Sequence, residues 1–101
     1  MMPERFYVYL LANGPCGWLY VGVTRNLLRR VAEHKEGRLP GYTAERGIDR
    51  LVWYETHLNL DMAILRERRI KRWRRAWKFV LVEEGNPRWT DLYGALRAGQ
   101  A

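Results

Sequence analysis

The chain has 101 residues, 48% of them hydrophobic and 13% aromatic, which suits one compact domain over residues 1–101 with one modest core. Its 18 Lys and Arg against 11 Asp and Glu give a net charge of +7, which favours a polyanionic partner, most often nucleic acid. Cys16 is the only cysteine, which excludes an intrachain disulfide and a cysteine-rich zinc site.

The first segment, MMPERFYVYLLANG, places an acid and a base before an apolar run that is too short for the hydrophobic region of a secretory signal. We find no stretch apolar enough and long enough to span a bilayer. We therefore expect a soluble, cytoplasmic protein that has no membrane partner.

A β-hairpin is predicted next. Residues 5–11 and 18–23 are rich in Tyr, Val and Leu and bracket the segment ANGPCG, which predicts two strands joined by a loop of about six residues.

A symmetrical loop pairs Tyr9 with Tyr20 and Tyr7 with Gly22, all on one face of the sheet. In that pairing Gly22 leaves room where Tyr7 and a ligand need it. The other interpretation of the two facing tyrosines is a simple cross-strand aromatic contact.

The segment TRNLLRRVAEHK predicts a helix that begins with Thr24 as its N-cap and ends at Gly37. Its buried stripe holds Leu27, Leu28 and Val31.

Arg30 and His34 lie four residues apart on this helix, at the margin of the apolar stripe. A side chain at the margin is held in place yet reaches a cleft. The alternative is an arginine that extends to solvent along the surface and a partly buried histidine.

The glycine-rich residues 37–49 predict a loop over one edge of the domain, and residues 50–56 predict a third strand. A long helical segment follows with Asp61 as its N-cap, broken near Arg74 and Arg75 into two helices.

The end of the chain is less regular. Residues 79–82 have the composition of a short strand as an alternative to helix, GNPRW predicts a turn, and residues 90–99 predict a short final helix or tail.

Glu67 shares a helix face with Ala63 and Ile70, on the side expected to pack toward the sheet. A carboxylate among cations near the core is either a ligand for a hard divalent cation such as Mg²⁺ or half of an i,i+4 pair with Lys71.

Basic residues surround Trp73 and Trp77, a composition that suits a phosphate-binding surface. We interpret the two tryptophans as mostly core. The candidate nucleic-acid-binding residues are Arg66, Arg69, Lys71, Arg72 and Arg75, and a solvated helix face is the alternative.

Taken in order, these pieces resemble the GIY-YIG nuclease superfamily, and most closely its small single-domain bacterial members. The resemblance rests on YVY, LYVGVT, RRVAEHK, LVWYE, AILRERRIKRWRR and NPRW, and it extends from about Phe6 to Leu92. It implies an α/β fold, a small three-stranded antiparallel sheet flanked by helices.

The resemblance also implies a set of catalytic residues: Tyr9, Tyr20, Arg30 and His34. The metal-binding glutamate of the family falls on Glu67, which implies Mg²⁺ or Mn²⁺ as the cofactor. Gly22 and Asn86 are the expected structural residues near the site, although an Asn-Pro turn explains Asn86 equally well.

Three positions depart from the family pattern. Tyr7 replaces the first glycine, Val23 replaces a lysine of the repair excinuclease subunit, and Arg46 stands where small bacterial members usually have a tyrosine.

The expected function is that of a metal-dependent endonuclease, structure-selective in its choice of substrate, that hydrolyses phosphodiester bonds in DNA, with RNA not excluded. The alternative is a non-catalytic nucleic-acid-binding module that retains the fold. The sequence leaves the oligomeric state open.

Overall fold

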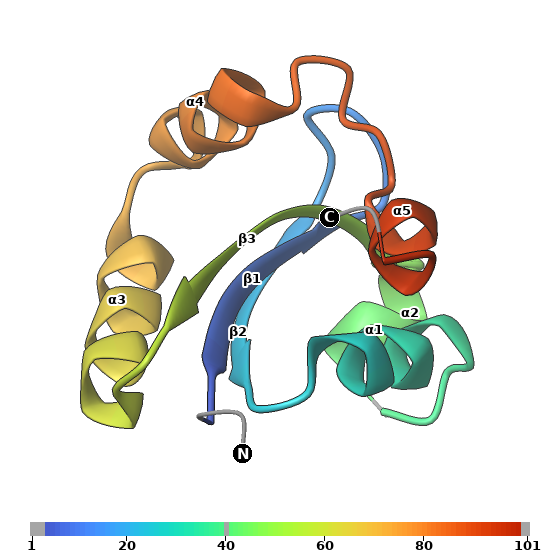
Figure 1. Ribbon diagram of the computed structural model, residues 1–101. Helices are drawn as coiled ribbons and strands as arrows, with labels where there is room; N and C mark the ends of the chain where they lie inside the picture. Colours follow the sequence, from blue (N-terminus) through green and yellow to red (C-terminus); the bar gives the residue numbers. More distant parts are fainter. Residues whose placement is uncertain (1–3, 40, 100–101) are drawn as a thin grey trace.

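A three-stranded antiparallel sheet forms the centre of the molecule (Figure 1). The computed structural model describes residues 4–39 and 41–99. The strands are β1 (Phe6–Ala12), β2 (Leu19–Thr24) and β3 (Arg50–His57), in the order β2-β1-β3. The predicted fold class is confirmed. Because β1 pairs on both sides, β2 is an edge strand, and one side of its backbone is left without a neighbouring strand.

The register of the hairpin differs from the predicted one by two residues. Tyr9 pairs with Gly22, and Tyr20 pairs with Leu11. The loop keeps its expected length but lies one residue later, at 13–18, where the Asn13 Oδ1 atom accepts a hydrogen bond from the Trp18 amide at 2.9 Å. A shift of two residues keeps every side chain on its face, so the two tyrosines still share one.

The two faces of the sheet build separate halves of the core. Val8 and Leu10 on β1 pack with residues of α3 (Leu60–Arg72) and α4 (Arg75–Gly85). Tyr9 and Leu11 point to the other face, toward α1 (Leu27–Lys35), α2 (Tyr42–Arg46) and α5 (Tyr93–Arg97). Figure 1 shows these two groups of helices on opposite sides of the sheet.

Helix α1 begins two residues later than predicted. Asn26, not Thr24, is the N-cap, and its Oδ1 atom accepts from the Arg29 amide. The Thr24 hydroxyl instead accepts from the Asn26 amide in the turn before the helix. Leu27 is buried as expected, whereas Leu28 is exposed because it lies beyond the stripe that faces the sheet.

The predicted loop at 37–49 contains a helix. Helix α2 is five residues long and lies between Gly41 and Gly47, both of which have a positive φ. These glycines allow the chain to turn sharply into and out of the helix, a turn that L side chains strongly disfavour.

The second half of the chain is more helical than predicted. The Asn59 side chain, not Asp61, caps α3 by accepting from the Met62 amide. The predicted break is confirmed at Trp73 and Arg74, which are extended. Residues 79–82 are helical rather than a strand.

In the part of the chain that the structure describes, no helix has both the length and the apolar composition needed to cross a membrane.

Candidate active site at the edge of the sheet

Tyr9 lies beneath the edge strand, and Gly22 makes its position possible. A Cβ atom added at Gly22 would lie 2.5 Å from both Cζ and the hydroxyl oxygen of Tyr9. Gly22 therefore accommodates Tyr9, its direct partner across the strands, and not Tyr7 as predicted. Tyr9 is fully buried, and the missing side chain at Gly22 leaves room for its hydroxyl against β2.

Three rings from three elements meet above this glycine. The ring centres of Tyr9 and Tyr20 lie 6.2 Å apart, those of Tyr9 and His34 6.2 Å, and those of Tyr20 and His34 5.2 Å. The structure thus brings together two predicted tyrosines and the predicted histidine, with the tyrosines in diagonal contact.

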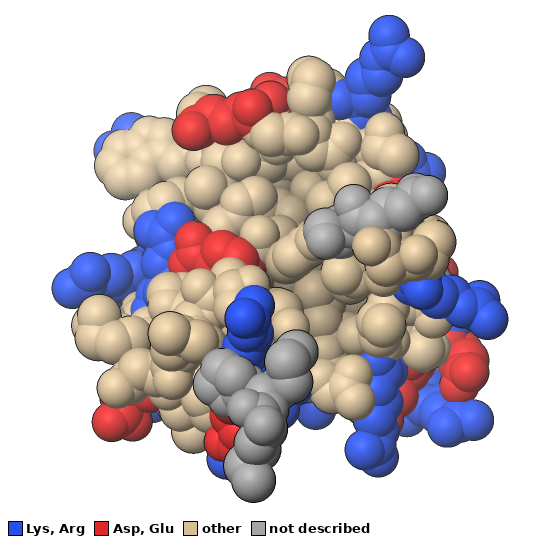
Figure 2. All heavy atoms as spheres, in the orientation of Figure 1, with Lys and Arg blue, Asp and Glu red and all other residues tan. Residues whose placement is uncertain are grey.

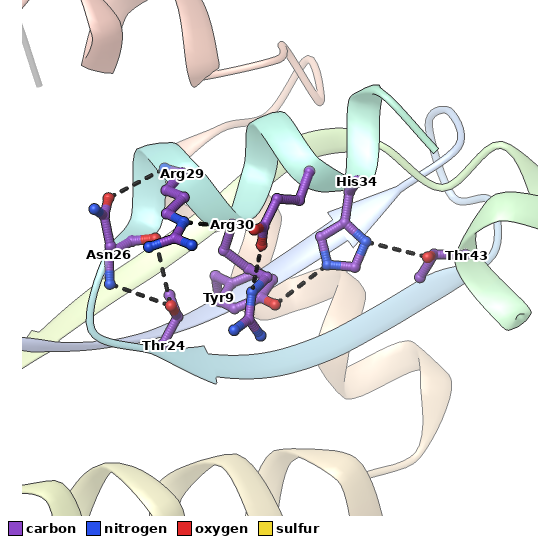
Figure 3. A network of polar contacts seen from close by, with 8 residues as sticks. Tyr9, Thr24, Asn26, Arg29, Arg30, His34 and Thr43 are labelled. Atoms are coloured by element: carbon purple, nitrogen blue, oxygen red, sulfur yellow. Dashed lines mark hydrogen bonds and ion pairs between the residues drawn. The ribbon is translucent and has the colours of Figure 1, made fainter. Parts of the chain in front are cut away.

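His34 links the tyrosine to helix α2 through both ring nitrogens. Its Nε2 atom lies 3.4 Å from the Tyr9 hydroxyl, and its Nδ1 atom lies 3.1 Å from the Thr43 hydroxyl (Figure 3). A neutral imidazole has one donor and one acceptor nitrogen, so one tautomer donates from Nδ1 to Thr43 and accepts the Tyr9 proton at Nε2. Thr43 was not predicted, because a buried threonine in a glycine-rich segment gives no pattern of its own.

Burial shifts the pKa values of both groups toward their neutral forms. It lowers the pKa of His34 from the usual 6.5, and the nearby positive charge of Arg30 lowers it further. Burial also raises the pKa of Tyr9, with Tyr20 adding to the rise and Arg30 opposing it. At neutral pH the pair is therefore a phenol beside a neutral imidazole.

The Arg30 side chain extends from α1 past the Tyr9 ring toward β2 (Figure 3). Its Nε atom contacts the Glu33 carboxylate at 3.2 Å, and its side chain is 39% exposed. The contact at Nε orients the guanidinium. Arg30 also lines a pocket. The residues of this pocket are Thr24, Arg25, Asn26, Arg29, Arg30 and Glu33. Three arginines against one glutamate make this pocket positive, which suits a phosphate.

Glu67 lies across the sheet from this cluster. It projects from α3, which packs against β1 and β2 on the other face. Its side chain is 12% exposed, and Lys71 contacts it at 2.9 Å, so the predicted i,i+4 pair is present. No hydrogen bond or ion pair joins Glu67 to Tyr9 or His34 among the described residues. In Figure 3, α1 and the yellow α3 flank the sheet from opposite sides.

The family model of the GIY-YIG catalytic domain matches residues 5–80. The chain belongs to the GIY-YIG family. The predicted recognition is thereby confirmed, and membership in this family of nucleases implies a nucleic-acid substrate.

The three similar proteins described next are each named as a UPF0213 protein, a name that states no activity. The chain is 32% identical over 82 residues to a UPF0213 protein of Staphylococcus epidermidis, covering 81% of this chain and 99% of that one. It is 41% identical over 83 residues to a UPF0213 protein of Natronomonas pharaonis, covering 82% and 96%. The solution NMR structure of a UPF0213 protein from Bacillus halodurans is similar with a TM-score of 0.54 and 30% identity, covering 86% of this chain and 92% of that one.

GIY-YIG nucleases generally use divalent metals, and the donor set here fits that use with one carboxylate. No group of three or more His, Cys, Asp and Glu side chains gathers within the described ranges. Mg²⁺ often takes only one or two protein carboxylates and completes its shell with water and phosphate oxygens. Glu67, partly buried on a basic helix, is the side chain that would hold such an ion.

Two of the predicted nucleic-acid-binding arginines have partners inside the protein. Arg66 contacts both oxygens of Glu55, at 2.9 and 3.3 Å, and its guanidinium lies over Trp53 and Trp73. Arg75 donates to the carbonyl oxygens of Cys16 and Gly17, at 3.1 and 2.6 Å.

Arg69 and Arg72 are exposed instead, and within residues 4–39 and 41–99 no hydrogen bond or ion pair holds either one. Lys and Arg side chains project around the rim of the face in Figure 2, over α3 and over α1, with a mostly uncharged surface between them. Trp73 is partly buried as expected, whereas Trp77 is 56% exposed and is not a core residue.

Asn86 is a buried structural residue. Its side-chain amide donates to the carbonyl oxygens of Val52 and Thr90, and its Oδ1 atom accepts from the Thr90 amide at 3.0 Å. These bonds tie the chain after α4 to β3, which supports the turn interpretation of this residue.

Proposed function

We propose that the protein is a metal-dependent endonuclease that hydrolyses phosphodiester bonds in DNA. The observation that carries the proposal is the hydrogen-bonded chain from Tyr9 through His34 to Thr43, beside Arg30, in a domain of a nuclease family. Each of these groups has a role in hydrolysis of a phosphodiester, and a purely structural core would not require a phenol beside a neutral imidazole.

The attacking water is activated through Tyr9. A water that is hydrogen-bonded to the phenol oxygen gives its proton to that oxygen while the phenol proton passes to Nε2 of His34. The imidazole becomes positively charged, and its Nδ1–H group donates to Thr43 throughout. Tyr20, in contact with both rings, orients the water.

Arg30 neutralises the phosphate. Its planar guanidinium offers two parallel donors to the non-bridging oxygens, and their negative charge grows in the transition state. A divalent cation held by Glu67 would supply Lewis-acid stabilisation of the leaving oxygen.

The decisive test is a cleavage assay with and without Mg²⁺ on duplex, single-stranded and branched DNA, with an RNA strand included. We expect Mg²⁺-dependent products that disappear in Arg30→Ala. Binding to these substrates without any cleavage in either Mg²⁺ or Mn²⁺ would support the non-catalytic binding module instead, which the observed pairing of Glu67 with Lys71 favours.

A further inference from the structure

Two exposed aromatic side chains and an arginine form a layered cluster beside the active site that the proposed chemistry does not use. The Arg46 guanidinium carbon lies 4.4 Å from the ring centre of Tyr42 and 5.3 Å from that of Trp18. Trp18 is 52% exposed and Tyr42 is 41% exposed. We call Trp18, Tyr42 and Arg46 the aromatic platform.

The side chain of Asn13 fixes the backbone at two residues of the aromatic platform. Asn13 accepts from the Trp18 amide through Oδ1 and donates from Nδ2 to the Arg46 carbonyl oxygen at 3.2 Å. One asparagine thus ties the hairpin loop to helix α2. The Arg75 guanidinium carbon also lies 5.8 Å from the Trp18 ring centre, and the ring still remains half exposed.

The aromatic platform adjoins the active site on two elements. Trp18 directly precedes β2 and lies two residues from Tyr20, about 7 Å along an extended chain, since each residue of a strand advances about 3.3 Å. Tyr42 neighbours Thr43 on α2, and Thr43 is bonded to His34. A base one or two nucleotides from a phosphate at Arg30 is within reach of this surface.

The chemistry of the cluster suits a flat, unpaired nucleobase. Aromatic rings stack any base by its π-face, and a guanidinium stacks on rings and attracts phosphate. Glu45 contacts Arg46 at 3.7 Å, but this pair is exposed and therefore weak, so it leaves Arg46 free to move. In a duplex the same base is already stacked and would have to be extruded.

We propose that the aromatic platform stacks an unpaired base and so directs the enzyme to single-stranded DNA or to unpaired bases next to a duplex. This inference rests on the proposed function for its place beside a scissile phosphate. The stacking itself can be measured without cleavage.

The test is fluorescence anisotropy of the full chain with a labelled 12-nucleotide strand and with the matching duplex, in EDTA so that no DNA is cut. Trp18→Ala should weaken binding of the single strand by roughly 10-fold and change duplex binding less than about 2-fold. Trp77→Ala removes an equally exposed tryptophan on α4 and serves as the matched control, with both affinities unchanged.

A second arm separates stacking from charge. An abasic strand of the same length keeps every phosphate and lacks every base, so the wild type should bind it more weakly than the normal strand. Trp18→Ala should distinguish the two strands much less than the wild type does, because only Tyr42 is left to stack a base. A single strand of RNA should respond to Trp18→Ala in the same way, because its bases present the same faces.

Equal losses on single strand and duplex, no loss on either, or an equal loss in Trp77→Ala would overturn the proposal, provided that thermal melts show folded variants. A platform-dependent preference for single strands in a protein that cuts nothing would uphold the stacking and reject the proposed nuclease activity.

Discussion

At the scale of single residues, the hydroxyl of Tyr9 distinguishes a packing role of this side chain from the proposed catalytic role. The Tyr9 ring fills the core under Gly22, and Phe would fill the same space. Only the oxygen reaches His34. The proposed mechanism therefore depends on an atom that contributes little to the packing of the sheet.

Tyr9→Phe and Tyr20→Phe should each lower the single-turnover cleavage rate by roughly 10²-fold, the usual scale for lost acid-base assistance. The melting temperature should fall by only a few degrees, since one neutral hydrogen bond contributes about 1 kcal/mol. Tyr54→Phe is the matched control, because this tyrosine pairs with Tyr9 on β3, makes an edge-to-face contact with Tyr7 and has no hydrogen bond to His34 among the described residues. Normal rates in both site variants would leave these tyrosines as packing residues.

His34 makes the stability of the protein depend on pH. Burial and Arg30 lower its pKa in the folded state, opposed by Glu33 and Asp49, so protonation favours the unfolded chain. The stabilisation is complete above pH 6.5, falls as the pH drops below the unfolded value, and levels off below the folded pKa. Thermal melts between pH 7.5 and 5 should show a larger loss of stability for the wild type than for His34→Gln. Parallel curves would contradict the lowered pKa.

At the scale of elements, the hairpin shows what a hydrophobic pattern can predict. Alternation along β1 and β2 places Tyr9 and Tyr20 on one face whatever the pairing, because side chains alternate with a period of two. The register depends on how the turn closes, and the bond from the Trp18 amide to the Asn13 side chain that closes it leaves no periodic signal.

Helices α1 and α2 also show that the sequence pattern predicts which residues share a helix face, but not which residues of different elements contact each other. Spacing placed Arg30 and His34 on one margin of α1, and the family resemblance gave them roles. Thr43 could not be predicted, because its bond to His34 depends on a five-residue helix that two glycines allow in a segment with the composition of a loop. Glu67 was predicted to face the sheet, yet periodicity does not specify which face of the sheet receives the helix.

The close contact between Gly22 on β2 and the Tyr9 ring on β1 predicts that a larger side chain at position 22 lowers both stability and cleavage. Gly22→Ala should force the Tyr9 ring out of place, which costs roughly 1–3 kcal/mol of stability and lowers cleavage, as inserted methyl groups in packed cores do. Gly14→Ala, where no atom lies within 4 Å of the added Cβ, should change neither quantity. Unaltered melts and rates for Gly22→Ala would show that the ring relaxes freely.

At the scale of the whole molecule, the proposed site draws on both faces of the sheet. Tyr9, His34 and Arg30 lie on the face that packs against α1, and Glu67 projects from α3 on the other face. A metal-dependent reaction needs both at one phosphate, which makes Glu67 the most informative single residue.

Glu67→Gln should abolish cleavage while DNA affinity stays equal or rises, because a negative charge leaves a basic surface. Lys71→Met breaks the same ion pair from its other end and should retain cleavage. Rates in Mg²⁺ and anisotropy in EDTA measure the two effects. If both variants cleave like the wild type, Glu67 is half of a surface pair and holds no catalytic metal.

The protein has a net charge of +7, and we expect the exposed arginines of α3 to contribute to its attraction for DNA phosphates. Arg69→Ala and Arg72→Ala should each weaken binding to all duplex sequences alike and reduce the log–log salt slope by about one unit. Arg66→Ala should lower the melting temperature and leave the slope unchanged, since Glu55 already pairs with this arginine. Identical slopes in all three variants would assign Arg69 and Arg72 to a solvated face.

Tyr9 and Thr43, which both contact His34, belong to elements that differ in stability. Tyr9 belongs to the central strand, which is hydrogen-bonded on both sides and opens only when the whole domain does. Thr43 belongs to a helix of one and a half turns between two glycine hinges, a segment of the kind that frays first on warming. Heat should therefore loosen the contact between Thr43 and the imidazole well before the sheet melts, so that helix α2 sets the temperature at which the proposed turnover declines.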